Sequence, residues 1–405
     1  MINQSATRNR VLWPRVCGLA AVQGAIALTW VIYNLYLKKL LTQYGFSPEF
    51  ATALLILENL LATIMEPLMG SFSDRFQHWM GSRFPFIAVG IILASTCFIA
   101  IPTVLAFGGP SGIARWLLPI AMVLWAFTMT LFRSPALSLL GRYAFASNLP
   151  QAASILTLVG GLAGAMGPIA GDFILRMGPL FTFGLGSVIL LGAGAVLRAV
   201  GPDQGISTSN NAPVIANTPL IQSIKKLALV FGTGVGSTLG FRLMMKTLPS
   251  SLPADLPETS LINGKIVIGA IFITLAVTAL PSGILATRLG TKRGIISGLG
   301  AMAICCGGLA IAQGQGVFLV LLAIALGTCF SLVSNTTIPF ALSMVSPQKA
   351  GLGTGMFFSG GAAASSLFGS VAPTLANLPN SVGALLGAGG YAIAAFCVML
   401  SRKYD

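Results

Sequence analysis

Apolar runs long enough to cross a membrane recur along the whole chain, and short segments rich in charged, Gly or Pro residues separate them. As a helix, a run of about 20 residues crosses the hydrocarbon core of a bilayer, which is roughly 30 Å thick. The pattern therefore predicts an all-α integral membrane protein with twelve transmembrane helices in two six-helix repeats. The predicted spans cover residues 15–40, 49–72, 84–107, 115–134, 150–175, 179–200, 222–246, 262–285, 292–313, 315–338, 350–374 and 382–401.

A polar motif at the end of the second span is repeated one half-chain later. The first copy, EPLMGSFSDRFQHWMGSRFPFIAVG at residues 66–90, is predicted to pass between two spans through a short loop that holds Asp74 and Arg83. The second copy, GILATRLGTKRG at residues 283–294, has Thr287 where the first has Asp74. The repeat indicates two related halves.

The stretch between the halves, GPDQGISTSNNAPVIANTP, is rich in Gly, Pro, Ser and Asn, as is typical of a loop. We therefore divide the chain into an N-terminal bundle (1–200), a cytoplasmic linker (201–221) and a C-terminal bundle (222–405). Parallel repeats of this kind are typical of secondary transporters that hold their substrate near the bilayer midplane.

Composition supports the membrane class. Apolar residues make up 55% of the chain and charged residues only 8%, too few charges to cover the surface of a soluble protein of 405 residues. The 48 glycines fit closely packed helices in lipid. The six cysteines lie in apolar runs without metal-type spacing, so we predict neither a metal site nor a cofactor.

The net charge of +14 would suggest nucleic acid in a soluble protein, but here the positive-inside rule accounts for it. With the N-terminus inside, 16 of the 23 basic residues fall on the cytoplasmic side. The others are Lys38, Lys39, Arg115, Arg176, Arg242, Lys246 and Lys265. We expect a monomeric, multi-pass protein of a bacterial inner or plasma membrane, with both termini cytoplasmic, the lipid bilayer as its surroundings and no nucleic-acid partner.

The first copy of the motif resembles the signature loop of the sucrose-transporter-like and glycoside/cation-symporter branch of the major facilitator superfamily. FRSPALSLLGR, residues 132–142, is similar to the Arg-x-Pro-Ala-Leu segment of that branch. The resemblance implies the major facilitator fold and transport of a sugar or glycoside by alternating access. The matching loop positions are Pro67, Gly70, Ser73, Asp74, Arg75, Gly81, Arg83, Pro85, Phe86 and Ile87.

The resemblance also implies a gate. Asp74 is expected to contact basic groups and the N-terminal end of the eleventh span, where the helix dipole favours a carboxylate. The predicted gating residues are Gly70, Asp74, Arg75, Gly81, Arg83, Arg288, Gly290, Lys292 and Arg293. Two positions depart from the branch: Arg142 lies at or beside a position where many members have an aspartate linked with proton coupling, and Glu66 replaces a glutamine.

Three acidic residues fall inside predicted spans, where an ionisable group is costly and by default functional. Glu58 lies near the midplane and is the first candidate for a proton-binding carboxylate, with a protonated, hydrogen-bonded structural carboxyl as the alternative. Glu66 is a second proton-coupling candidate, although a structural ion pair with Arg133 or Arg142 is favoured. Asp172 is expected to pair with Arg176 at the i+4 spacing.

The substrate cavity is expected between the first, fourth, seventh and tenth spans, which line it in this superfamily. An aromatic face with amide and hydroxyl groups would suit a hydroxylated solute. The candidates are Gln23, Trp30, Asn34, Trp125, Thr128, Ser237, Arg242, Ser334 and Asn335.

We therefore predict a secondary active transporter of a small organic solute, with a sugar or glycoside as the first candidate and proton coupling left open. A facilitator or an exporter of another metabolite stays open, since Arg142 could favour an anion. A membrane assembly or pigment-handling protein on the same fold is a further alternative. No HExxH or GxSxG motif and no nucleotide-binding loop is found, so an enzyme is not expected.

Overall fold

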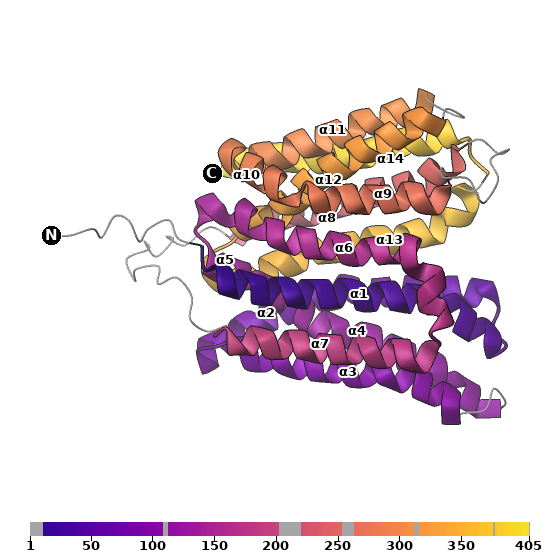
Figure 1. Cartoon of the computed structure of the whole chain (residues 1–405). Coiled ribbons are helices and arrows are strands. Elements are labelled where there is room, and N and C mark those ends of the chain that lie inside the picture. The colour runs from indigo at the N-terminus through magenta and orange to yellow at the C-terminus, as the bar shows by residue number, and fades with distance from the viewer. Residues whose placement is uncertain are drawn as a thin grey trace.

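The computed structural model describes residues 11–107, 112–201, 220–252, 263–311, 316–375 and 377–404, and these residues form helices and short connections (Figure 1). The first half contains α1 (Trp13–Gln43), α2 (Pro48–Met80), α3 (Phe84–Phe107), η2 (Gly112–Trp116), α4 (Leu117–Ser138), α5 (Leu140–Tyr143), η3 (Ala146–Asn148), α6 (Leu149–Arg176) and α7 (Pro179–Ala199). The second half contains α8 (Leu220–Ser250), α9 (Gly264–Val277), α10 (Ala279–Leu289), α11 (Thr291–Ile311), α12 (Gly316–Ser343), η4 (Pro347–Lys349), α13 (Ala350–Leu375), α14 (Asn380–Ser401) and η5 (Arg402–Tyr404).

The helices are long and apolar enough for a multi-pass membrane protein. Ten helical segments of the described chain can cross a bilayer, and α9 with α10, bent by 57° at their junction, gives an eleventh. The remaining long helix, α13, has 26 residues, or about 39 Å at 1.5 Å per residue, but it is rich in small residues. The predicted all-α, twelve-span architecture is therefore confirmed. Most of the linker, residues 202–219, lies outside the described residues.

Helix α2 extends further than the sequence analysis predicted. Ser47 caps its start by accepting from the Phe50 N–H, with Pro48 in the first turn. No Gly or Pro interrupts residues 71–80, and Gly81, with φ +77°, is the first residue to take the left-handed conformation that ends the helix. The prediction that Asp74 lies in a loop was wrong, because it lies on the last turns of α2.

Two hydrophobic cores organise the molecule. One is built from buried residues between Val11 and Leu197, and the other from residues between Val230 and Val398. Between these cores α2 packs on α13, and α6 packs on α9, α10 and α12. The two halves therefore meet along two seams, with α13 lying between α2 and α8.

The α2–α13 seam depends on glycine. A Cβ atom on Gly70 would lie 2.2 Å from the carbonyl oxygen of Gly351, and one on Gly351 would lie 2.4 Å from the carbonyl oxygen of Gly70. One turn along α13, a Cβ on Gly355 would lie 2.4 Å from the carbonyl oxygen of Glu66. Any side chain here would push the two helices apart, because the atoms that it meets belong to backbone.

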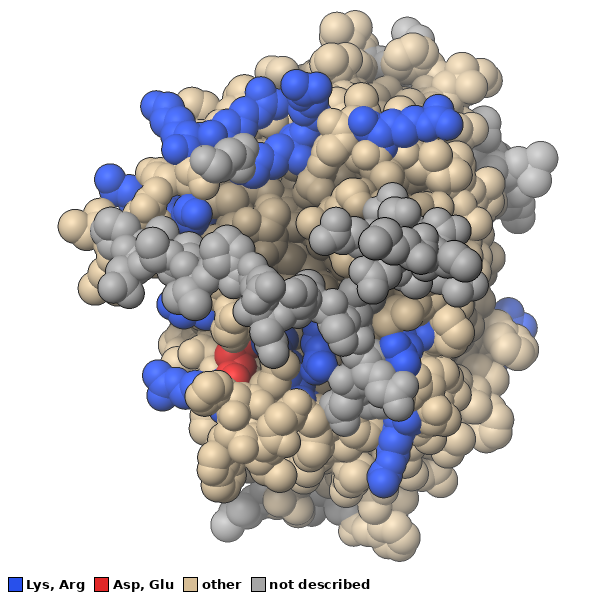
Figure 2. Space-filling view, turned by 90° about the vertical axis from the view of Figure 1, so that its left-hand side faces the viewer, with Lys and Arg blue, Asp and Glu red and all other residues tan. Residues whose placement is uncertain are grey.

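Lys and Arg side chains gather at one end of the molecule, which we call the basic end. It contains the start of α1, the α2–α3 junction and the start of α13, and Figure 2 shows Lys and Arg side chains spread over its surface with little acidic surface between them. Arg75, Arg288 and Arg293 are exposed there. A strip of positive charge at one end of a helical bundle is what the positive-inside rule describes.

Candidate substrate cavity and gate

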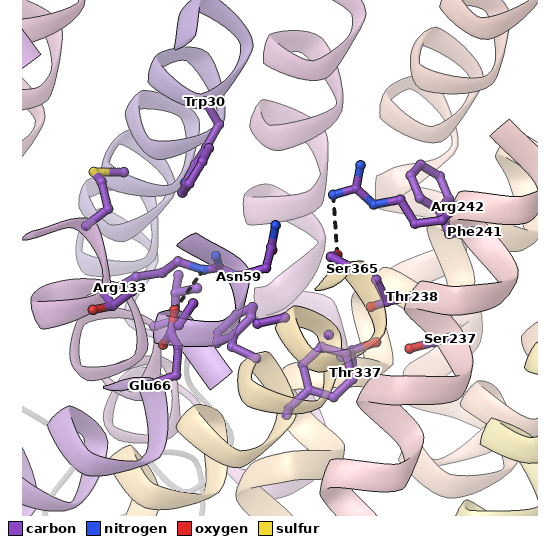
Figure 3. A pocket seen from close by; sticks show the side chains of 18 of the residues that line it. Trp30, Asn59, Glu66, Arg133, Ser237, Thr238, Phe241, Arg242, Thr337 and Ser365 are labelled. Carbon is purple, nitrogen blue, oxygen red and sulfur yellow. Dashed lines mark hydrogen bonds and ion pairs between the residues drawn. The ribbon is translucent and has the colours of Figure 1, made fainter. Parts of the chain in front are cut away.

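A cavity of about 540 Å³ lies between the two halves. Helices α1, α2 and α4 line it from one half, and α8, α12 and α13 from the other (Figure 3). The sequence analysis expected the spans that correspond to α1, α4, α8 and α12, and it missed α2 and α13. Six predicted cavity residues line it, namely Gln23, Trp30, Asn34, Ser237, Arg242 and Ser334.

Three predicted cavity residues do not line it. Trp125 is fully buried in an aromatic cluster of the first half, with its ring centroid 4.4 Å from that of Tyr33. Thr128 donates to the Trp125 carbonyl oxygen of its own helix at 2.8 Å. Asn335 turns toward α10, where it donates to the Ala279 carbonyl oxygen at 2.8 Å. Each of these side chains points away from the cavity. Helical spacing shows which residues share a face of a helix, but it does not show which face borders the cavity.

Other lining residues were not predicted. They include residues of α2 and α13, apolar residues of α8 and α12, and polar residues of α4, α8 and α12 that the sequence analysis did not assign to the cavity. The principal ones are Asn59, Thr130, Arg133, Thr238, Phe241, Phe330, Thr337, Phe357, Phe358 and Ser365.

Glu66 and Arg133 form an ion pair on one wall of the cavity. Arg133 Nε lies 3.7 Å from Glu66 Oε1, and its guanidinium carbon lies 4.0 Å from the centre of the Phe358 ring. The Glu66 side chain is 1% exposed. Sequence analysis assigned Arg133 to the cytoplasmic surface, but α4 continues past it to Ser138, so Arg133 faces the cavity instead.

Glu58, one of the two proton-coupling candidates, is buried beside the aromatic cluster. Its Oε1 accepts a hydrogen bond from the Tyr33 hydroxyl, while its Oε2 is buried without a hydrogen-bond partner among the described residues. The structure thus places both acidic candidates in the cavity wall, one paired with a phenol and the other with a guanidinium.

Arg242 faces the same cavity from α8. Its Nη2 donates to Ser365 Oγ at 3.3 Å, and Figure 3 shows the guanidinium directed into the space between the helices. No carboxylate of the described residues lies within ion-pair distance of it. Among the described residues, the hydrogen-bond partner of the Arg242 guanidinium is therefore a neutral hydroxyl.

Several polar side chains of the lining donate hydrogen bonds to backbone carbonyl oxygens of their own helices. Ser237 donates to the Thr233 carbonyl oxygen at 2.7 Å, Thr337 to that of Val333 at 2.7 Å and Thr130 to that of Phe127 at 2.7 Å. The Asn34 and Asn59 amides donate to carbonyl oxygens four residues back, at 2.7 Å each. Such back-bonding leaves hydroxyl oxygens able to accept but uses their protons.

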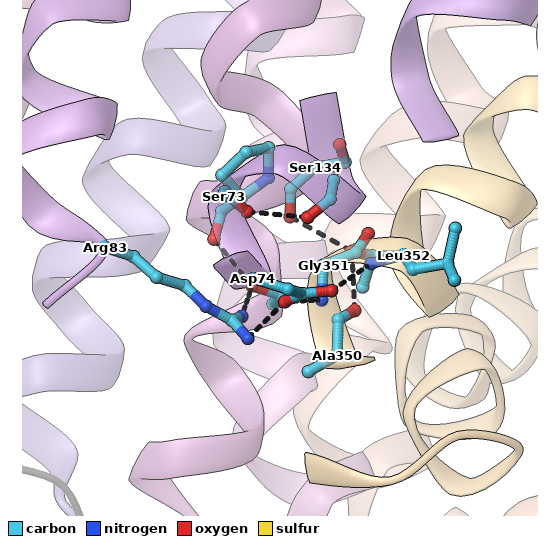
Figure 4. Close-up of polar contacts among 11 residues, drawn as sticks. Ser73, Asp74, Arg83, Ser134, Ala350, Gly351 and Leu352 are labelled. Carbon is cyan, nitrogen blue, oxygen red and sulfur yellow. Dashed lines mark hydrogen bonds and ion pairs between the residues drawn. The ribbon is translucent and has the colours of Figure 1, made fainter. Parts of the chain in front are cut away.

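The contact predicted for the gate lies at the basic end (Figure 4). Asp74 Oδ1 accepts from the Gly351 N–H and Oδ2 from the Leu352 N–H, both at 2.9 Å, so the carboxylate caps the N-terminus of α13. Arg83 donates to Asp74 Oδ1 and to Ser138 Oγ of α4. The expected contact of Asp74 with the eleventh span is therefore observed.

Arg83 is more deeply buried than the carboxylate that it contacts, with 1% of its side chain exposed against 8% for Asp74. Burial lowers the pKa of the Arg83 guanidinium, and the charge of Asp74 opposes that shift. A further hydrogen bond joins α13 to α4, since Thr354 Oγ1 donates to the Ser134 carbonyl oxygen at 3.0 Å. These contacts close the basic end.

The cavity continues toward the opposite end. A pocket of about 270 Å³ shares Asn34 and Leu55 with it and reaches Lys38 and Glu49, at the end of α1 and the start of α2. The structure is therefore closed at the basic end, with free space extending from the cavity toward the other end.

Asp172 has a different partner from the one predicted. It accepts from Lys265 Nζ of α9 at 2.8 Å, and both side chains are about two-thirds exposed, at 66% and 65%. The i+4 pair with Arg176 was wrong as its principal contact, because α9 of the other half packs beside α6.

The family model described as Major Facilitator Superfamily matches residues 19–369. The chain belongs to the major facilitator superfamily. Members of this superfamily are transporters rather than enzymes, so the protein is a multi-pass membrane transporter by family. No curated protein sequence matches the chain.

Solved structures of superfamily members share the fold at low sequence identity. The human organic anion transporter MFSD10 (TETRAN) is 15% identical, covers 95% of this chain and 99% of its own, and superposes with a TM-score of 0.70. The proton:xylose symporter XylE is 13% identical, with coverages of 97% and 96% and a TM-score of 0.71. A bacterial homologue of the iron transporter ferroportin is 17% identical, with coverages of 96% and 99% and a TM-score of 0.71. Because these proteins carry different solutes, the likeness defines the fold and leaves the solute open.

Proposed function

We propose that this protein is a secondary transporter that moves a small organic solute through the central cavity by alternating access. The observation that carries the proposal is a cavity between the two halves, closed at one end by the Asp74 cap on α13 and continuous with a pocket at the other. Release of that cap would let the halves separate at the basic end, and the differential affinity of the solute for the two forms would drive the exchange.

We further propose that the basic end faces the cytoplasm, that both termini are cytoplasmic and that the membrane is a bacterial inner or plasma membrane. The positive charge of this end supports the orientation. In that orientation the structure corresponds to the outward-facing or occluded form. Cysteine-labelling of Arg75→Cys and of Lys265→Cys in sealed cells tests it: a membrane-impermeant thiol reagent should reach only position 265, and labelling of position 75 alone would reverse the orientation.

Proton coupling is proposed at Glu58 and Glu66. Both carboxyls are buried in the cavity wall, and an ionisable group inside a membrane that contacts a water-filled path is a candidate proton carrier. Glu58→Gln keeps the shape and the Tyr33 contact but cannot bind a proton. If Glu58 couples, gradient-driven accumulation is lost in this variant and exchange of solute is kept. Accumulation that persists in Glu58→Gln and disappears in Glu66→Gln would move the coupling site to Glu66.

Two solute classes are supported by different observations. The α2–α3 motif resembles that of sucrose-transporter-like proteins, which favours a sugar or glycoside. Arg242, which pairs with no carboxylate of the described residues, favours an anionic metabolite. An uncoupled facilitator or exporter would share the same cavity.

The test is uptake by proteoliposomes. The full-length protein is reconstituted and offered radiolabelled sucrose, maltose, glucose and organic anions, each with and without an inward proton gradient. Accumulation with the gradient supports a symporter, and equilibration that ignores the gradient leaves a facilitator. If none of these solutes moves while the protein is folded and correctly inserted, the transport proposal fails for this panel and an assembly or pigment-handling role becomes the next candidate.

A further inference from the structure

The charge arrangement of the cavity separates its two arginines. Arg133 is paired with Glu66 and stacked on Phe358, so its charge is already balanced. Arg242 contacts only the Ser365 hydroxyl, and no acidic side chain of the described residues pairs with it. Arg242 is exposed within the cavity, so its unpaired charge is available to an anionic group of a solute.

Some hydroxyl groups of the lining have no proton left to donate to a solute. The hydroxyl groups of Ser237, Thr337 and Thr130 donate their protons to carbonyl oxygens of their own helices. The strong donors left to a solute include the guanidinium of Arg242 and the indole N–H of Trp30, which is buried and without a partner among the described residues. Neutral amide and hydroxyl groups, such as those of Gln23 and Ser334, also line the cavity. The feature that favours an oxyanion over a sugar is therefore the unpaired charge of Arg242.

The walls near Arg242 are aromatic. Phe241 and Phe330 have ring centroids 4.7 Å apart, and Phe357 lines the same cavity from α13. These rings would cover an apolar body while the guanidinium holds the charged group. The volume of about 540 Å³ is within the range of roughly 300–1,000 Å³ of pockets that hold small organic ligands.

We infer that the transported solute is an organic oxyanion with an apolar or aromatic body, held at its charged group by Arg242 with Ser365. This inference rests on the proposed transport function and names its substrate class. Carboxylate, sulfonate and phosphate ester groups share the required chemistry. The planar guanidinium can hold each of them through two parallel N–H···O bonds, which a lysine cannot reproduce.

The test measures binding and uptake with the same full-length protein. Binding is followed in detergent by thermal stabilisation and calorimetry with an aromatic carboxylate, its neutral amide, an aliphatic carboxylate, an aromatic sulfonate, an aromatic phosphate ester and sucrose. The variants are Arg242→Gln and Arg242→Lys, with Arg115→Gln as the matched control, because Arg115 stacks on Phe46 and Trp116 outside the cavity. Uptake of the same compounds is measured in proteoliposomes.

We expect at least one anion to bind and its neutral amide not to bind. Arg242→Gln should weaken binding by about tenfold or more, the effect of losing charge-assisted hydrogen bonds, with Arg242→Lys between it and the wild type and Arg115→Gln unchanged. Uptake of sucrose that Arg242→Gln leaves intact would overturn the anion inference and retain the transport proposal. Anion binding that depends on Arg242 without uptake of any compound would retain the oxyanion site and overturn transport. Absence of both binding and uptake in folded protein would overturn both.

Discussion

The two copies of the motif form two seams of the same kind with different chemistry. At the first, Gly70 of α2 lies against Gly351, the second residue of α13. At the second, Gly283 of α10 lies against α6, where its Cβ would come 3.3 Å from the carbonyl oxygen of Pro150, the second residue of that helix. The repeat therefore conserves the close approach of a glycine to the first turn of a helix from the other half.

Of the two copies of the motif, only the first places a carboxylate at its seam. Asp74, four residues after Gly70, accepts from two N–H groups of α13, whereas Thr287, four residues after Gly283, donates to the Gly283 carbonyl oxygen of its own helix at 2.9 Å. The partner helix also differs, because Pro150 has no N–H to offer where Gly351 has one. A carboxylate at position 287 would find one donor fewer, which gives a physical reason for the threonine.

The basic partner differs as well. Arg83 binds Asp74 and Ser138, while Lys292 of the second copy extends to the Ser401 carbonyl oxygen of α14 at 3.0 Å. The close approach of the glycine and the carboxylate cap are therefore separable parts of this motif. The α2–α13 seam has both, and the α6–α10 seam has the steric part without a carboxylate cap.

The largest effect is expected from Gly351→Val. The added atoms would overlap the Gly70 backbone, so the closed basic end cannot form and transport should fall by at least about tenfold, the loss expected for an overlap that only helix displacement relieves. Uptake and the accessibility of a cysteine placed beside the seam measure it. Gly300→Val is the matched control, since nothing lies within 4 Å of its Cβ position. Normal transport in Gly351→Val would mean that the seam does not need this approach.

Asp74→Asn should have the next largest effect. A neutral amide cannot accept from both N–H groups of α13 and loses the charge that balances Arg83. Each hydrogen bond to a charged group contributes about 1.5–3 kcal/mol, so the closed form should lose about tenfold or more in population. Distance distributions between spin labels on α4 and α12 at the basic end measure the shift. An unchanged distribution would remove Asp74 from the gate.

Gly283→Ala tests the steric part alone at the second seam. Its Cβ would lie 2.6 Å from the Ser154 Cβ, so we expect transport to fall about threefold to tenfold, as for mild overpacking. Ser154→Gly in the same chain should restore it, because the clash is with that side chain. If the double variant is no better than the single one, the seam is held by other contacts.

The double variant Thr287→Asp with Pro150→Ala would build a carboxylate cap on the N-terminus of α6. The pair supplies a carboxylate and an N–H, so the closed form should gain a few-fold in population, within the range of a helix-terminal charge. Thr287→Asp alone should gain less. The spin-label distances that report Asp74→Asn report this change too, and a gain equal in both variants would contradict the role given to Pro150.

The smallest effect is expected from Asp172→Asn. Its pair with Lys265 joins α6 and α9 but is exposed to solvent, and such pairs change equilibria by about threefold or less. Uptake rates at low and high salt measure it. A loss as large as that of Asp74→Asn would show that exposure is a poor guide to the weight of a contact in this protein.

Much of the fold could be predicted from the sequence. Spans of predominantly apolar residues must become helices in lipid, since every backbone polar group has to be satisfied internally, and this placed the helices within a few residues. The error at α2 had a local cause: polar residues before Gly81 resemble a loop, but nothing in them breaks a helix until Gly81 does.

The site was predicted in part. Gln23, Trp30 and Asn34 recur at helical spacing along one face of α1, and this periodicity predicted them as cavity residues. All three line the cavity. Trp125 and Asn335 were misplaced because a buried polar or aromatic side chain can turn to a neighbouring helix of its own half as readily as to the cavity. The contributions of α2 and α13 follow from their crossing, which no local pattern encodes.

The sequence by itself determined the membrane class, the number of helices, the two related halves and the carboxylate that contacts the eleventh span, because apolar length, repetition and motif can be read along the chain. Only the tertiary structure decided which basic residues are surface charges and which are cavity groups. Arg133 and Arg242 have the same side chain, and what separates them is that α2 brings Glu66 to the first while no carboxylate of the described chain reaches the second. Ion pairing depends on which helices meet, and that is a property of packing.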